Sequence, residues 1–90
     1  MESETVLKGF CIVVLDRGFV YVGNVEHSKD WCVIHNSRNI RQWGTTKGLG
    51  ELALGGPTKD TKLDVVGTVR APARAVISLI DSEESRWNSK

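Results

Sequence analysis

Two runs of β-branched and aromatic residues, separated by three turn-forming residues, constrain the fold of this chain more than any other feature. Residues 9–15 (GFCIVVL) are apolar throughout, which is typical of a strand buried on both faces, whereas residues 19–25 alternate between two faces. Asp16, Arg17 and Gly18 lie between the runs, and Gly18 is able to take a positive φ. The pattern predicts a β-hairpin with two apolar faces, both of which need to be covered.

Shorter strands are predicted downstream of this hairpin. They are expected at residues 31–36, 62–70 and 75–80, and the last is assigned as a strand because of its β-branched content. The intervening segment at residues 36–47 is polar and basic, and its residues 40–43 have the pattern of a short strand. The first three strands are expected to form an antiparallel meander.

One short helix interrupts this series of strands. Apolar residues at helical spacing predict it at about residues 48–55, and the Gly-Gly-Pro sequence at residues 55–57 is a stop signal. In the strand that follows, Leu63, Val65 and Val69 are expected to share one face. The chain is therefore predicted to be mainly β, a small antiparallel sandwich or barrel with one short helix.

Length and charge limit the classes of protein to which the chain can belong. Residues 1–90 are expected to form a single domain, with residues 1–8 and 82–90 as flexible or interface-forming tails. Twelve basic and 11 acidic residues give a net charge of +1, which disfavours a dedicated duplex-DNA binder. No stretch approaches the roughly 20 apolar residues that span a bilayer, and the acidic start does not resemble a signal peptide. A cytoplasmic protein without a membrane partner is expected.

Residue types that commonly carry out catalysis or bind metals are few and poorly spaced. Cys11 and Cys32 lie inside apolar runs, where a thiol is expected to be reduced, buried and inert. His27 and His35 are not spaced in a way that pre-organises a metal site with these cysteines. We therefore expect a protein that works by binding a ligand or partner. It is not expected to catalyse a reaction, to hold a metal ion or to use a cofactor.

The polar segment after the third strand has the chemistry of a nucleotide-binding surface. If it is extended, Asn39, Arg41 and Trp43 share a face, where guanidinium, indole and amide groups suit a phosphate, a base and a base edge. The glycine-rich sequence at residues 44–50 follows, and its amides, together with the start of the short helix, are expected to favour an anion. The alternative is a solvated loop in which Trp43 anchors the core.

The other two tryptophans are assigned by their surroundings. Trp31 begins an apolar strand and is expected to pack in the core. Trp87 lies in a polar tail, so it is expected either to cap the core or to form an oligomer contact.

Four segments form a recognisable pattern: Asn39 to Trp43, the pair Thr45 and Thr46, the run GLGELALG at residues 48–55, and Lys62-Leu63 before an apolar strand. The chain resembles a set of short, uncharacterised bacteriophage proteins that share an Arg-x-Trp, Leu-x-Glu-Leu-Ala, Gly core. The resemblance covers roughly residues 10–80, and it brings no assigned chemistry with it.

More loosely, a compact phage protein of this kind is similar to the viral "sponge" proteins. These are small β-rich homo-oligomers that sequester nucleotide immune signals of the bacterial host, such as cyclic dinucleotides or cyclic ADP-ribose isomers. The resemblance implies an anti-defence protein in the host cytoplasm that binds and sequesters a cyclic oligonucleotide or cyclic ADP-ribose type of signal. It further implies a homo-oligomer without catalytic machinery.

On this hypothesis, eight residues are expected to bind the ligand. Phosphate contacts are assigned to Arg38, Arg41 and Lys47, base stacking to Trp43 with Tyr21, and hydrogen bonds to Asn39, Thr45 and Thr46. A second hypothesis is an interaction module that inhibits a host protein through an edge strand or Trp87. A third is a nucleic-acid-binding regulator that uses the same basic segment, which the balanced charge disfavours.

Overall fold

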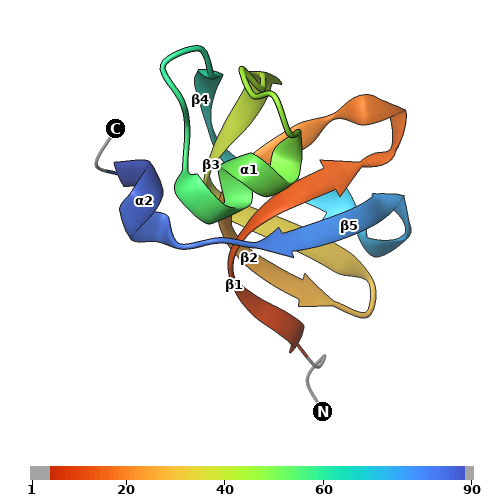
Figure 1. Ribbon diagram of the computed structural model, residues 1–90. Coiled ribbons are helices and arrows are strands. Elements are labelled where there is room, and N and C mark those ends of the chain that lie inside the picture. Colours follow the sequence, from red (N-terminus) through yellow and green to blue (C-terminus); the bar gives the residue numbers. More distant parts are fainter. Residues whose placement is uncertain (1–4, 89–90) are drawn as a thin grey trace.

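The chain is mainly β, as predicted, in the computed structural model, which describes residues 5–88. Its strands, two short helices and two 3₁₀ turns follow one another along the chain (Figure 1). In order they are β1 (Thr5–Leu15), η1 (Asp16–Gly18), β2 (Val20–Ser28), β3 (Trp31–Gln42), α1 (Leu49–Gly55), β4 (Lys62–Pro72), η2 (Ala73–Ala75), β5 (Val76–Asp81) and α2 (Glu84–Asn88).

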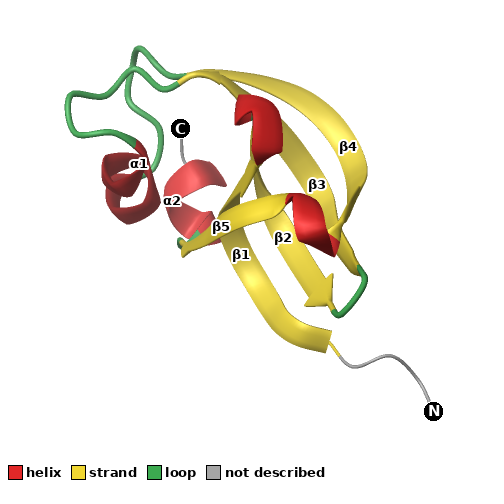
Figure 2. Ribbon diagram, turned by 90° about the vertical axis from the view of Figure 1, so that its right-hand side faces the viewer, coloured by secondary structure: helices red, strands yellow, loops and turns green. Residues whose placement is uncertain are grey.

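The strands form one antiparallel sheet in the order β4-β3-β2-β1-β5. The predicted hairpin is β1 and β2, joined at η1, where Gly18 has a φ of 84°. The meander continues to β4, and β5 then returns to the other side of β1, where Leu79 lies opposite Val13. The sheet is bent without closing into a barrel, so β4 and β5 are its two edges (Figure 2).

Each face of the bent sheet carries its own apolar cluster. The inner face is built by side chains from all five strands, with buried members Cys11, Val13, Leu15, Val25, Cys32, Ile34 and Ala71. The opposite face, which we call the helix face, is covered by α1 and α2, with buried members Ile12, Val20, Val22, Ile40, Leu52, Ala53 and Trp87. The continuous apolar run of β1 serves both clusters, which explains why its sequence does not alternate.

β3 is one long strand, which corrects the prediction that a strand ends at residue 36. Its register against β2 and β4 shifts at residues 34–38, Asn36 takes a φ of 51°, and a Cβ at Gly23 would lie 2.7 Å from a backbone oxygen of β3. Ser37 is buried there and donates a 2.6 Å hydrogen bond to the Gly67 carbonyl. Pairing on both sides therefore keeps this polar segment in the sheet despite its sequence.

The same irregularity reassigns the faces of β4. Gly67 has a φ of 100°, and Val66 is an extra residue between the pairs Ser37–Gly67 and Arg38–Val65. Because a bulge shifts the alternation by one residue, Val69 joins the inner cluster whereas Leu63 joins the helix-face cluster. The prediction that Leu63, Val65 and Val69 share a face is wrong for this reason.

Both predicted tails contribute to secondary structure where the structure describes them. Thr5–Lys8 belongs to β1, and α2 places Trp87 in the helix-face cluster with an exposed fraction of 0%. The Trp87 indole Nε1 donates a 2.9 Å hydrogen bond to the Ser82 hydroxyl, which donates in turn to the Ala53 carbonyl at 2.6 Å. Of the two alternatives for Trp87, the cap over the core is the one observed. Within residues 5–88, neither helix is long and apolar enough to cross a membrane.

Candidate functional site

Three of the eight expected ligand residues lie on one face of the sheet, in adjacent rows. Tyr21 of β2 is directly opposite Asn39 of β3, which is in turn opposite Asp64 of β4. The register of β3 shifts between Ile40 and Gln42, so alternation does not place Arg41; its ion pair with Asp64 puts its guanidinium on the same face as Asn39. The Asn39 side-chain nitrogen donates to the Val20 carbonyl at 3.1 Å, which fixes its amide within the sheet.

Arg38 lies on the opposite face. Its guanidinium carbon is 5.9 Å from the centroid of the Trp87 ring, a cation–π geometry that supports the packing of α2. Arg38 and Arg41 are therefore separated by the sheet, and the structure does not bring them together as two sides of one phosphate site.

Arg41 is held by an ion pair with Asp64. Its Nε donates to one carboxylate oxygen at 2.9 Å and its Nη2 to the other at 3.4 Å, and both side chains are exposed. The hydrogen bond that Arg41 donates to the Asp64 carboxylate, followed by the charge of that carboxylate, raises the pKa of Arg41. The pair orients the guanidinium plane and leaves its remaining N–H groups available to another acceptor.

Trp43 follows β3 with 43% of its surface exposed, so it is not the core anchor of the alternative prediction. Its backbone is nevertheless fixed, because the Thr61 hydroxyl donates to the Trp43 carbonyl and the Thr58 hydroxyl to the Gly44 carbonyl, both at 2.7 Å. A Cβ at Gly44 would lie 2.4 Å from the backbone of Asp60, so glycine permits this close approach. A constrained backbone thus presents a partly open indole.

The glycine-rich loop differs from its prediction. Its Thr46 and Lys47 amides donate to the same oxygen of Glu51, at 3.2 and 3.1 Å, and the Thr45 hydroxyl oxygen accepts from the Gly48 amide at 3.1 Å. Glu51 lies in the first turn of α1 and reaches back as in a capping box. The chain's own carboxylate therefore takes the place of the expected anion.

The Lys47 side chain remains exposed beside this loop. It lines a shallow hollow of about 540 Å³ with Gly50, Glu51, Leu54 and Gly55. Of the expected ligand residues, Arg41, Trp43 and Lys47 thus keep exposed functional groups near the C-terminal end of β3.

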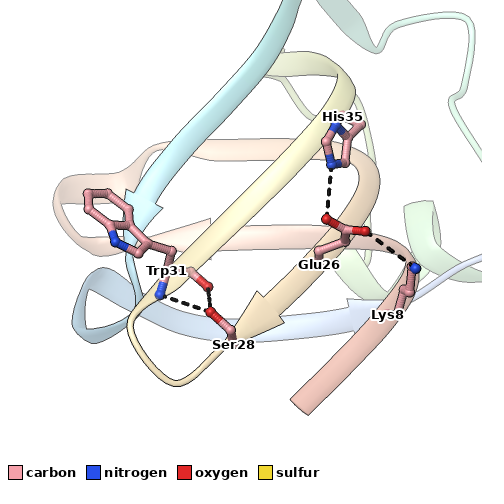
Figure 3. Close-up of polar contacts among 5 residues, drawn as sticks. All are labelled: Lys8, Glu26, Ser28, Trp31 and His35. Carbon is pink, nitrogen blue, oxygen red and sulfur yellow. Dashed lines mark hydrogen bonds and ion pairs between the residues drawn. The ribbon is translucent and has the colours of Figure 1, made fainter. Parts of the chain in front are cut away.

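A polar cluster at the other end of β3 was not predicted. Glu26 of β2 lies between His35 and Lys8 (Figure 3). Its Oε1 is 3.4 Å from His35 Nε2, and its Oε2 is 3.4 Å from Lys8 Nζ. The hydrogen bond from His35, followed by that from Lys8, lowers the pKa of Glu26. Trp31, on β3 like His35, is 52% exposed, so its prediction as a core residue is wrong. The sequence did contain a signal for this exposure, because strand alternation puts Trp31 on the same face as the polar His35.

The cysteines have the environment that their apolar neighbours predict. Cys11 and Cys32 are free and buried. Burial, followed by a 3.6 Å hydrogen bond to the Asp81 carboxylate, raises the pKa of the Cys11 thiol to about 11, and burial raises that of Cys32. Thiols with such pKa values are poor nucleophiles near neutral pH. Among residues 5–88, no group of three or more His, Cys, Asp and Glu residues is arranged to hold a metal ion.

Comparison of the chain with known protein families, with curated proteins and with solved structures found no match.

Proposed function

We propose that this chain is a binding protein that sequesters a nucleotide-derived signalling molecule of the cyclic oligonucleotide or cyclic ADP-ribose type. Such a protein would block bacterial anti-phage immunity without chemical conversion of the signal. The observation that carries the proposal is the partly exposed indole of Trp43, two residues after the oriented and exposed guanidinium of Arg41. An aromatic platform beside a cation suits a base that is linked to a phosphate.

Five of the expected ligand residues keep a role in this scheme. Trp43 stacks on the base, while the free N–H groups of Arg41 bind a phosphate oxygen. Lys47 adds a second cation from the loop, as a point charge on a flexible stem. Tyr21 and Asn39 border the site on the Arg41 side. The Asp64 carboxylate beside Arg41 repels a phosphate, which limits the affinity of the site for isolated phosphate.

A ligand screen tests the proposal. We expect one cyclic nucleotide or ADP-ribose derivative to raise the melting temperature, since ligand at 100 times its Kd adds about 2.7 kcal/mol to the stability of the folded state. Recovery of the same compound, unaltered, after denaturation is expected. A compound that is recovered cleaved would contradict sequestration.

Two matched pairs of variants locate the site. Trp43→Ala is expected to weaken ligand binding roughly thirty-fold in calorimetry, whereas Trp31→Ala, at the other end of β3, is expected to leave it unchanged. Arg41→Ala and the exposed Arg74→Ala form the second pair. Equal effects of the two tryptophan variants, or of the two arginine variants, would show that the ligand does not bind at this site.

Inhibition of a host protein is the second candidate function. It is favoured by exposed large apolar side chains, among which Leu54 on α1 is 79% exposed. A host protein that binds the purified chain with a defined stoichiometry, and no response in the ligand screen, would favour this function. Binding of nucleic acid with a steep salt dependence would instead favour the regulator.

A further inference from the structure

Both edges of the sheet are open in the part of the chain that the structure describes. β4 pairs with β3 alone and β5 pairs with β1 alone, and the order of the sheet puts them at opposite ends. An edge strand presents unpaired backbone donors and acceptors along its outer side, which is a template for another strand. β4 is 11 residues long, so it offers an edge of unusual length for a sheet of this size.

Exposed apolar side chains are found on both edges. Val65 of β4 is 87% exposed, and its neighbour Val66 is the extra residue of a bulge. Ile77 of β5 is 65% exposed and is likewise an extra residue, between the pairs that Val76 and Ser78 make with β1. Apolar side chains at this level of exposure on an unpaired strand are typical of a protein contact.

The charges of the two edges are complementary. β4 carries Lys62 and Arg70, both exposed, while its Asp64 is already paired with Arg41. β5 ends at the exposed Asp81 and is followed by the exposed Glu84, while the intervening Glu83 is already paired with Arg86. Pairing of β4 with another β4 would bring like charges together, whereas pairing of β4 with β5 brings opposite charges together. The net charge of +1 imposes little overall repulsion between copies.

We propose that the outer edge of β4 in one copy pairs with the outer edge of β5 in a second copy. The contact is head-to-tail, so it repeats from copy to copy and produces a closed ring or an open chain. It also buries apolar surface that a 90-residue chain leaves exposed when it folds alone. The inference is independent of the ligand proposed above.

Single substitutions of opposite sign test the two edges. Val65→Asp places a negative charge opposite the acidic edge, and Ile77→Lys places a positive charge opposite the basic one. In light scattering after size exclusion, the unmodified chain is expected to exceed its monomer mass of 9.9 kDa, and each variant alone is expected to be a monomer. Leu54→Asp and Leu54→Lys are the matched controls, since Leu54 is comparably exposed but belongs to α1, which is part of neither edge strand; they are expected to assemble normally.

A mixture of the two edge variants distinguishes this arrangement from a symmetric one. The Val65→Asp variant keeps a free β5 and the Ile77→Lys variant keeps a free β4, so together they are expected to form a one-to-one complex of twice the chain mass. Contact between two copies of β4 would instead leave the Ile77→Lys variant assembled by itself. That result overturns the proposal, as does a monomeric unmodified chain at every concentration or an equal loss of assembly in the Leu54 controls.

Discussion

Trp87 and Trp43 lie in similarly polar stretches of the sequence, yet the first is fully buried and the second is 43% exposed. Trp87 packs against the distant Phe10, with ring centroids 6.2 Å apart, and its indole also donates to the nearby Ser82 hydroxyl. Trp43 is fixed through its backbone carbonyl, which accepts from Thr61. Local polarity therefore does not decide the burial of a tryptophan; the elements that fold back onto it do.

The difference separates two roles. The region around Trp87 closes the helix face, because α2 lies beside α1 (Figure 1 and Figure 2) and ties the end of the chain to it. The region around Trp43 holds a backbone in place and leaves a side chain available. We expect changes in the first region to affect folding and changes in the second to affect binding.

The largest expected difference in stability is between the variants that lack one or the other of these two indoles. Trp87→Ala leaves a cavity among buried side chains and is expected to lower the free energy of unfolding by about 3–5 kcal/mol. Trp43→Ala removes a partly exposed side chain and is expected to cost less than about 1 kcal/mol. Urea denaturation followed by circular dichroism measures both. Similar midpoints for the two variants would break the comparison.

The Trp87 region also shows what the sequence is able to predict. The hairpin, the helix at residues 48–55 and the last strand follow from apolar periodicity and turn residues, and all three are confirmed. Burial of Trp87 depends on its contacts with Phe10 and Ala53, which lie far away along the chain. No local pattern encodes such a contact, so the sequence left two alternatives open.

A smaller effect is expected where α1 meets α2. Gly56 has a φ of 81°, and a Cβ there would lie 2.5 Å from the Arg86 carbonyl oxygen. Gly56→Ala is therefore expected to displace α2 and to lower the free energy of unfolding by about 1–3 kcal/mol. Gly55→Ala is the matched control, because a Cβ at Gly55 meets nothing within 4 Å. Equal stability of the two variants, measured by thermal unfolding, would show that this close approach is not required for α2 to pack.

The candidate site was less predictable than the fold, for two physical reasons. The bulges in β3 and β4 shift the alternation, so faces assigned from a regular strand are wrong beyond them, as Val65 and Val69 show. The amides of the glycine-rich loop were expected to be open, but Glu51 is able to reach them from the first turn of α1. The exposure of Trp43 likewise depends on the loop at residues 58–61, to which its backbone is joined.

The smallest effect sharpens the comparison within the Trp43 region itself. Glu51 accepts from the Thr46 and Lys47 amides, so Glu51→Ala leaves two exposed donors to water and is expected to cost about 0.5–1 kcal/mol of stability. Glu51→Gln keeps an acceptor oxygen and is expected to retain most of that stability. Amide hydrogen exchange at Thr46 and Lys47 is expected to accelerate in the alanine variant, while exchange around Trp87 stays unchanged. Slow exchange at both amides in the alanine variant would mean that the loop is held by other contacts and that the capping carboxylate is not what closes it to an anion.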